Sequence, residues 1–281
     1  MYEVNKVREI MTENVIYCEV PSTRVEVLSI MKKHNLTCLP VVKKGTKKLV
    51  GIITRYSLLE KPMEEQTALI MTRDPIYVSP NHRIKDLAKA FIDHRIRYIP
   101  VVDNDELVGM VTVSDIVHKV LTKSTFYQPI KNFIERNFIA LWDKTPINVG
   151  WRIMELAKIY AAPVINSKLE VVGIFSASDI FSHIEIVVDE HKHVVKAATE
   201  GQEWDWDSLT IIYVGSKKLI LPEKPISEIM KREIVTLREE TSISQCAKKM
   251  RDLNLHILPV VNSEGVLTGV INDVNLIKIL T

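Results

Sequence analysis

The sequence contains the same pattern four times, and this repetition restricts the fold more than any other feature of the chain. In three copies a methionine precedes a proline by 29 residues, and these methionines are Met11, Met71 and Met230. Counting back 29 residues from Pro163 leads to Ile134, which places a more divergent copy third along the chain. A glycine follows each proline by 9 to 11 residues, and these glycines are Gly51, Gly109, Gly173 and Gly269. Such fixed spacing is typical of a repeat architecture.

Each copy has the same expected secondary structure. A short strand comes first, followed by a helix with apolar residues at helical spacing, which in the second copy are Ile84, Leu87, Ala88, Phe91 and Ile92. A strand around the proline, a polar turn, another strand and a second helix complete a β-α-β-β-α unit. A unit of about 60 residues buries too little surface to be stable alone, so we expect the units to pair. The predicted fold is α/β, of the α+β kind, with the repeats in two pseudo-twofold pairs.

The predicted boundaries divide the chain into four repeats and one insertion. The repeats span residues 1–62, 63–124, 125–186 and 223–281, and the insertion spans residues 187–222. Trp142 and Trp151 fall in the part of the third repeat that should be buried, so we predict that both belong to the core.

The insertion is expected to extend a helix and then to form a small hairpin at 210–222 with a glycine turn. On a helix, Asp189 and His193 would share a face while His191 would not. Because no cysteine or further ligand lies nearby, a solvated helix end is favoured over a metal site, and we predict no bound metal. Trp204 and Trp206 of the WDWD segment either form a partner-binding patch or pack over the core.

Composition narrows the class of protein. The formal net charge is +2, with 46% hydrophobic and 26% charged residues, so no charge imbalance points to a nucleic acid or a membrane surface as partner. Three isolated cysteines without a CxxC spacing argue against a disulfide framework or a structural zinc site, and fit a reducing compartment. No apolar run approaches the roughly 20 residues of a membrane span, and the first residues do not resemble a signal peptide. We therefore expect a cytoplasmic protein.

The strand-to-helix turn that closes each repeat carries polar side chains, as in GMVTVSDIV at residues 109–117. One explanation of Thr112 and Asp115 is helix capping, because Thr and Asp stabilise helix starts. The other is a nucleotide site. The first backbone N–H groups of a helix favour an anion, a hydroxyl can donate to phosphate, and a carboxylate can accept from both hydroxyls of a ribose diol.

The four copies of this turn differ in their polar groups. Two are complete, and they consist of Thr112, Ser114 and Asp115 in repeat 2 and of Ser176, Ser178 and Asp179 in repeat 3. Repeat 4 has Asn272 and Asn275, whose amides carry no charge, so its hold on a ribose should be weaker. Repeat 1 has Thr54 and Ser57 without a carboxylate, although Arg55 could meet a phosphate. The sequence therefore predicts two good sites, one doubtful site and one that is empty or altered.

These turns, GMVTVSD, GIFSASD, GIITRYS and GVINDVN, resemble the signature of the cystathionine β-synthase (CBS) domain family. The resemblance covers nearly the whole chain apart from the insertion, and two tandem pairs resemble a double Bateman module. Four repeats without an enzyme domain are also similar to the γ regulatory subunit of AMP-activated protein kinase and to archaeal four-CBS proteins. The resemblance implies a disc of repeats that binds adenine nucleotides, AMP first and ADP or ATP next, without catalysis. Fold alone does not establish this function.

The resemblance also suggests further site residues. The residues three positions before the repeat prolines are Thr37, Arg97, Tyr160 and His256. Of these, Arg97 and His256 are candidates for binding phosphate, and Arg is especially suited to it. The alternative is a solvated arginine and an ordinary half-buried histidine. In the family, the strand that opens the paired repeat lines the base, which implies Ile16, Tyr17, Ala140 and Val235.

Other functions remain open at this point. An enzyme is not favoured, because the sequence lacks a Ser-His-Asp motif, a P-loop, HExxH and the Rossmann GxGxxG. The alternatives to a nucleotide sensor are a ligand-free interaction scaffold and a binder of another adenosyl ligand such as S-adenosylmethionine. No cofactor is expected beyond the nucleotide ligand. A sensor implies a regulated protein as its partner, and four repeats can close a disc within a monomer or a homodimer.

Overall fold

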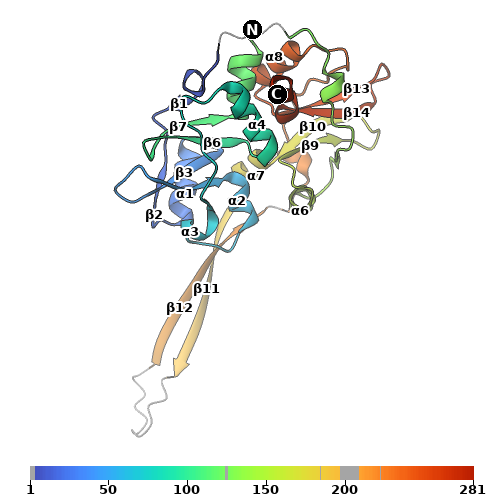
Figure 1. Cartoon of the computed structure of the whole chain (residues 1–281). Helices are drawn as coiled ribbons and strands as arrows, with labels where there is room; N and C mark the ends of the chain where they lie inside the picture. The colour runs from blue at the N-terminus through green and yellow to red at the C-terminus, as the bar shows by residue number, and fades with distance from the viewer. Residues whose placement is uncertain (1–3, 124–125, 184, 197–208, 222) are drawn as a thin grey trace, which may run out of the picture.

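The computed structural model describes residues 4–123, 126–183, 185–196, 209–221 and 223–281. It is a mixed α/β fold of small sheets and helices, which confirms the predicted fold class (Figure 1). Each repeat contains an antiparallel strand pair that carries its proline and its glycine, preceded by a helix and followed by a shorter one. The longer helices are α1 (Arg24–Lys33), α4 (Ile84–His94), α6 (Ile147–Ala157) and α8 (Ile243–Leu253).

The remaining elements follow the order of the repeats. The antiparallel pairs are β3 (Cys38–Lys43) with β4 (Leu49–Thr54), β6 (Tyr98–Asp103) with β7 (Glu106–Thr112), β9 (Ala161–Ile165) with β10 (Val171–Ser176), and β13 (Ile257–Val261) with β14 (Leu267–Asn272). The short helices after them are α2 (Arg55–Glu60), α5 (Val113–Ile116), α7 (Ala177–His183) and α9 (Asp273–Leu276). Helix α5 continues as a π-helical segment, Val117–Leu121, and α9 continues as a 3-10 turn, Ile277–Leu280. The opening strands are β2 (Cys18–Val20) and β8 (Leu141–Trp142), each parallel to its neighbour, and single bridges from Val78 and Leu237 replace them in repeats 2 and 4.

The helices bury the faces that their sequence periodicity predicts. In α4, the residues Ile84, Leu87, Ala88 and Phe91 are buried, while Ile92 is partly buried at the edge of the same core. The apolar stripe at helical spacing thus becomes the face that packs on the sheet.

Repeats pair because each one lends its first residues to a partner repeat. Strand β1 (Thr12–Glu13) of repeat 1 joins β7 of repeat 2, and β5 (Thr72–Arg73) of repeat 2 joins β4 of repeat 1. The second half of the chain does the same through Glu135 with Val270 and Lys231 with Ile174. The exchange is reciprocal, so repeats 1 and 2 form one module and repeats 3 and 4 form the other, in two pseudo-twofold pairs as predicted.

This exchange explains the methionine and the glycine of the repeat pattern. Met11 of repeat 1 lies on Gly109 of repeat 2, where a Cβ atom would come within 3.0 Å of both the Met11 Sδ and the Thr12 carbonyl oxygen. Gly173 has the same relation to Met230, with a Cβ placed 2.6 Å from the Met230 Sδ. Glycine is required here for close approach of the partner strand, and its φ angle is ordinary.

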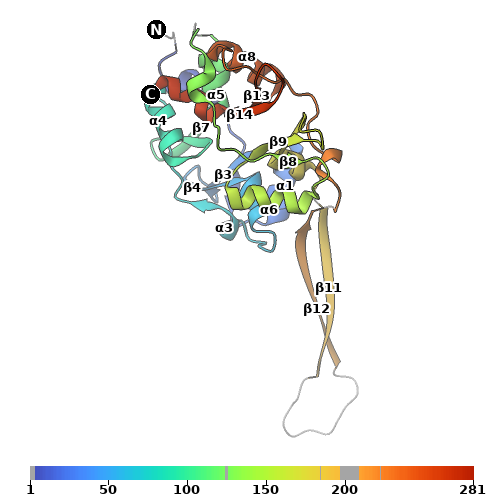
Figure 2. The same ribbon diagram turned by 90° about the vertical axis from the view of Figure 1, so that its right-hand side faces the viewer.

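The two modules pack through their helices and create two apolar cores that both contain residues of both modules. One core consists mainly of residues from repeats 2 and 4, and the other mainly of residues from repeats 1 and 3. Helix α2 contacts α7, and α5 contacts α9. Figure 2 shows the two resulting layers, with α4, α5 and α8 in one and α1 and α6 in the other. Contacts of repeats 1–2, 2–4, 4–3 and 3–1 close a ring of four, as the predicted disc requires.

The insertion corrects two predictions. Strands β11 (Glu185–Lys196) and β12 (Leu209–Ile220) form a long antiparallel ribbon that projects from the body (Figure 1). The predicted helix around Asp189, His191 and His193 is therefore wrong, and so is the glycine turn, because Gly215 pairs with Glu190 within the ribbon. Valines at both ends of the segment VVDEHKHVV favour a strand over a helix. Trp204 and Trp206 lie outside the described residues.

The two tryptophans of repeat 3 differ in burial. Trp151 is 6% exposed and packs edge-on against Tyr56, with ring centroids 5.1 Å apart, which confirms the prediction. The prediction for Trp142 is wrong, because its side chain is 47% exposed. Trp142 ends the two-residue edge strand β8, and the Lys144 ammonium lies 5.5 Å from its ring centroid.

Candidate functional site

The polar turn of each repeat caps the helix that follows it. Thr54, Thr112 and Asn272 are N-cap residues whose side chains accept the backbone N–H three residues later, at distances of 3.1, 3.2 and 2.7 Å. In repeat 3 the Asp179 N–H donates to the Ser176 hydroxyl at 3.4 Å. The capping explanation therefore applies to all four copies, and any ligand role is additional to it.

The two carboxylates of the complete turns, Asp115 and Asp179, have the same partners at Oδ2 but differ in what Oδ1 contacts. In each, Oδ2 accepts from the N-cap residue: Asp115 accepts from the Thr112 N–H at 2.9 Å and hydroxyl at 2.7 Å, and Asp179 accepts from the Ser176 N–H at 2.7 Å and hydroxyl at 2.6 Å. The Asp115 Oδ1 also meets the Lys119 ammonium at 2.8 Å. The Asp179 Oδ1 accepts no hydrogen bond from the part of the chain that the structure describes. Burial raises the pKa of Asp179 above its ordinary value, against the opposing effect of the Ser176 hydrogen bonds.

A backbone hydrogen bond in every repeat places the residue three before the proline beside the polar turn. Its carbonyl accepts the N–H of the residue that follows the N-cap. The distances are 3.1 Å for Arg55 to Thr37, Val113 to Arg97 and Ala177 to Tyr160, and 3.0 Å for Asp273 to His256. The two candidate phosphate-binding residues, Arg97 and His256, therefore lie next to the polar turns of their own repeats.

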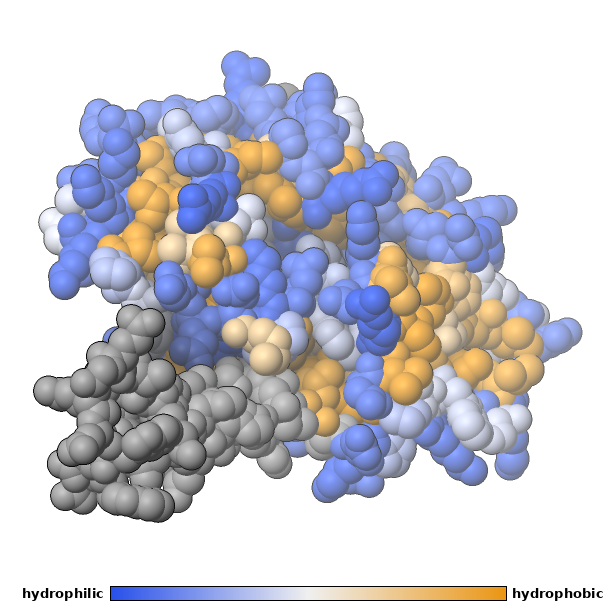
Figure 3. All heavy atoms as spheres, turned by 90° about the horizontal axis from the view of Figure 1, so that it is seen from below, coloured by the Kyte–Doolittle hydropathy of each residue, from blue (hydrophilic) through white to orange (hydrophobic). Residues whose placement is uncertain are grey.

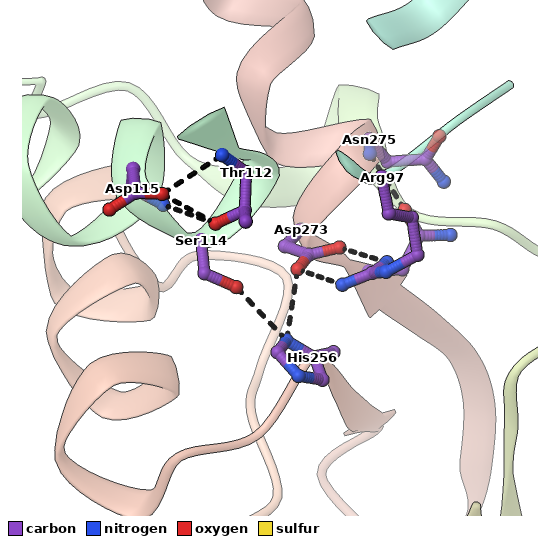
Figure 4. A network of polar contacts seen from close by, with 8 residues as sticks. Arg97, Thr112, Ser114, Asp115, His256, Asp273 and Asn275 are labelled. Carbon is purple, nitrogen blue, oxygen red and sulfur yellow. Dashed lines mark hydrogen bonds and ion pairs between the residues drawn. The ribbon is translucent and has the colours of Figure 1, made fainter. Parts of the chain in front are cut away.

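Arg97 of repeat 2 forms a buried ion pair with Asp273 of repeat 4 (Figure 4). The guanidinium donates from Nη1 to Oδ1 at 2.6 Å and from Nη2 to Oδ2, and the His256 Nδ1 lies 3.2 Å from the same Oδ2. Arg97 is 9% exposed and Asp273 is 2% exposed. Burial disfavours both charges, but their mutual attraction outweighs it, so the pKa of Asp273 is held below its usual value and the pKa of Arg97 above its own.

Ser114 completes this network without forming a catalytic relay. Its hydroxyl lies 3.3 Å from the His256 Nδ1, the same ring nitrogen that faces Asp273. A Ser-His-Asp relay needs the serine at one ring nitrogen and the carboxylate at the other. The three residues therefore do not have the geometry of a triad, in which the histidine takes the serine proton at one ring nitrogen while the aspartate accepts a hydrogen bond from the other.

Beside the network lies a cavity of about 490 Å³ between repeats 3 and 4. Its size is in the range of small-molecule sites. The apolar part of its wall includes Phe138, Ile139, Ile159, Ile257 and Val274. The polar part includes Arg95, Arg97, Glu135, Asn137, Lys158, His256, Asn272 and Asn275.

Two buried residues, Arg97 and Asn275, line this cavity and have side-chain groups that make no hydrogen bond within the described residues. Arg97 has five N–H donors, of which the described residues engage only the two bonded to Asp273. Asn275 is 7% exposed, and its side-chain amide makes no hydrogen bond within the described part of the chain. These groups are available for hydrogen bonds to a polar ligand in the cavity.

The structure thus brings together five of the predicted site residues, namely Arg97, Ser114, His256, Asn272 and Asn275. Ala140 directly follows the cavity segment Asn137–Ile139 without lining it. Tyr17 lines a separate cavity of about 540 Å³, Ile16 is exposed and Val235 is half-buried. The Ser178 carbonyl accepts from the Ser182 hydroxyl at 3.1 Å.

Arg55 of repeat 1 is held within the protein. Its Nε donates to the Leu36 carbonyl and its Nη2 to the Asn35 Oδ1, both at 2.8 Å, and its guanidinium lies 4.9 Å from the Phe181 ring centroid. Burial lowers the pKa of Arg55 from its ordinary value.

Sequence reasoning missed Asp273, the centre of the network. Its position is occupied by Val113 in repeat 2 and Ala177 in repeat 3, so a carboxylate there is a departure from the pattern. That departure, together with an unmatched arginine in repeat 2, is the signal that could have identified it.

Within the ranges the structure describes, no helix is long and apolar enough to cross a membrane, and no group of three or more His, Cys, Asp or Glu side chains could hold a metal ion.

The chain belongs to the CBS domain family. The family model matches residues 7–64, 67–122, 130–186 and 226–281, which together make up most of the chain. Full-length similarity extends to MJ1225 of Methanocaldococcus jannaschii, which is 24% identical over 97% of this chain and 98% of its own length. The crystal structure of MJ1225, described as a proposed archaeal homologue of γ-AMPK, superposes with a TM-score of 0.78 at 20% identity, over 98% of this chain and 100% of that one.

Two further solved structures match this chain in whole or in part. A conserved protein from Pyrococcus horikoshii superposes with a TM-score of 0.65 at 26% identity, over 98% of this chain and 100% of that one. The CBS domain pair of MJ0100, solved with 5′-methylthioadenosine and S-adenosyl-L-methionine, is 30% identical and covers 40% of this chain and 93% of its own, with a TM-score of 0.39. The full-length likenesses agree with the four-repeat fold described above.

Proposed function

We propose that this protein is a non-catalytic regulatory sensor that binds adenine nucleotides, with AMP as the preferred ligand. The observation that carries the proposal is the cavity between repeats 3 and 4, which combines apolar walls with the buried donors of Arg97. An adenine ring suits the apolar walls, and a phosphate suits the Arg97 N–H groups that Asp273 does not engage and the imidazole of His256.

The complete turns of repeats 2 and 3 are the other proposed nucleotide sites. There, Asp115 and Asp179 would accept from a ribose diol, and the hydroxyls of Ser114 and Ser178 would meet phosphate. The hydroxyls of Thr112 and Ser176 would meet phosphate only after turning away from the Asp115 and Asp179 carboxylates, to which they donate in the structure. Asp179 is more accessible to a ribose diol than Asp115 is, because the Lys119 ammonium already contacts the Asp115 Oδ1. A diol at Asp115 would first have to displace that ammonium group.

Regulation would follow from the origin of the cavity residues. Arg97 belongs to the first module, whereas His256 and most of the cavity wall belong to the second. A ligand that contacts both modules favours the orientation in which both contacts are made, and a partner protein can read that shift. We place this function in the cytoplasm, on the basis of three free thiols and ordinary composition.

Calorimetric titration of ligand-stripped protein with AMP, ADP, ATP and S-adenosylmethionine tests the proposal. We expect saturable AMP binding that weakens at least about tenfold in His256→Ala, since bonds to charged groups contribute about 1.5–3 kcal/mol. Asp103→Ala, at an exposed position of the β6 end, serves as the matched control. If only S-adenosylmethionine binds, the protein is a sensor of another adenosyl ligand and the AMP proposal is wrong. If none of the four ligands gives a heat of binding with folded protein, the interaction scaffold is favoured.

A further inference from the structure

The cavity between repeats 3 and 4 differs from the two complete turns at one position. Asn275 stands where Asp115 and Asp179 stand in repeats 2 and 3, three residues after the N-cap. A carboxylate only accepts hydrogen bonds and is best satisfied by two O–H donors side by side, as in a ribose diol. An amide accepts with one atom and donates with the other, so it gives no preference for a pair of donors.

The surroundings of Asn275 strengthen this difference. Its neighbour Asn272 accepts the Asn275 N–H through Oδ1 at 2.7 Å, which leaves the Asn272 NH₂ group, a donor, on the cavity side. A third amide, Asn137, lines the cavity from the paired repeat. Asp273, the carboxylate nearest in sequence, is engaged by Arg97 and His256. The turn that carries Asn275 therefore presents amides where repeats 2 and 3 present a carboxylate, and the carboxylate among the described wall residues, Glu135, comes from the paired repeat.

We propose that this cavity binds adenine nucleotides without reading the ribose diol, so that it accepts nucleotides with a missing or substituted 2′- or 3′-hydroxyl as well as AMP. The inference rests on the proposed function and adds the specificity of this one site. Phosphate and base carry the affinity here, through Arg97 and the apolar walls, while Asn275 adapts to a donor or an acceptor on the sugar. The turns with Asp115 and Asp179 would instead discriminate strongly in favour of the free diol.

The test compares AMP with 2′-deoxy-AMP by calorimetry in an Asp115→Ala/Asp179→Ala background, in which the carboxylates of the other two sites are absent. We expect the two ligands to bind with dissociation constants within about threefold of each other. In Asn275→Asp on the same background, AMP should bind about tenfold or more tightly than 2′-deoxy-AMP, because a charged acceptor then depends on the diol. Asn81→Asp, at an exposed loop position, should leave the ratio unchanged.

Asn275→Ala is a second variant that controls for misfolding. It should weaken the binding of both AMP and 2′-deoxy-AMP while the ratio of their dissociation constants stays near one. A strong preference for AMP in the Asn275 protein, with no further change in Asn275→Asp, would overturn the inference and leave the proposed function standing. Absence of binding by either ligand to folded protein, with the background mutations or without them, would overturn both.

Discussion

At the scale of single residues, one position carries four different side chains, one cationic, two apolar and one anionic, on the same backbone. The residue after the N-cap is Arg55, Val113, Ala177 or Asp273, and each donates its N–H to the same carbonyl of its repeat. Sequence comparison of the copies predicted the turns and the residues beside them, because these depend on spacing within one repeat. It could not predict the partner of Asp273, because Arg97 is 176 residues away and meets it only when the two modules pack.

The Arg97–Asp273 ion pair gives a prediction about stability. Asp273→Ala leaves the Arg97 charge buried without its carboxylate, so the free energy of unfolding should fall by about 3–5 kcal/mol. Urea denaturation followed by circular dichroism measures this, with Asp103→Ala expected within about 0.5 kcal/mol of the natural sequence. A double substitution of Arg97 and Asp273 by leucine should recover much of the loss, since apolar replacements of a buried pair are often tolerated. A loss below about 1 kcal/mol in Asp273→Ala would contradict a buried, engaged pair.

The same pair sets a pH dependence. The pKa of Asp273 is lower in the folded protein than in the unfolded chain, so its stabilising effect is complete above the unfolded value of about 3.9. That effect is lost as the pH falls through the lower, folded value. The stability difference between the natural sequence and Asp273→Ala should therefore narrow progressively as the pH falls below about 5.

At the scale of elements, the methionine and the glycine of the repeat are two halves of one contact between repeats. The sequence predicted their spacing but not their purpose, because each methionine contacts the glycine of the partner repeat and not its own. The ribbon of β11 and β12 was mispredicted for a related reason. Its strands pair with each other and project from the body, so the partner of each strand lies in the other half of the insertion (Figure 1).

Gly109→Ala tests the close approach of the first strand. The added methyl would lie 3.0 Å from the Met11 sulfur and from the Thr12 carbonyl oxygen, so we expect a loss of about 1–3 kcal/mol in the free energy of unfolding. In a double-mutant cycle, Met11→Ala should cost less in the Gly109→Ala background than alone, because it relieves the sulfur contact but not the carbonyl contact. Strictly additive effects would mean that Met11 and Gly109 do not touch.

At the scale of the whole molecule, neither module is complete without the other. The sequence predicted the pairs 1–2 and 3–4 from the distances along the chain. It did not indicate that the apolar cores would instead join 2 with 4 and 1 with 3, because helix faces of equal character can pack in several ways. Seen from below, apolar residues gather in patches on the face of the body (Figure 3).

The shared cores predict how half of the molecule behaves. A chain of residues 1–123 would expose the helix faces that repeats 3 and 4 cover, and an apolar surface of that kind drives association. We expect this fragment to form a dimer, measurable by size-exclusion chromatography with light scattering. Addition of the fragment 126–281 should convert the dimer into the 1:1 complex. A folded, monomeric fragment at high concentration would show that the cores close within each module.

The reciprocal strand exchange also governs how the protein can be made. Thr12 leaves the ribosome early but has no strand partner until Met110 has followed, and the helices of repeat 2 have no partner in repeat 4 until residues 243–280 are synthesised. During translation, the completed first module therefore exposes two apolar faces until repeats 3 and 4 are synthesised and cover them. The length of that period is set by the codons between residues 130 and 280, so synonymous changes there would alter the yield of native protein without altering a single contact.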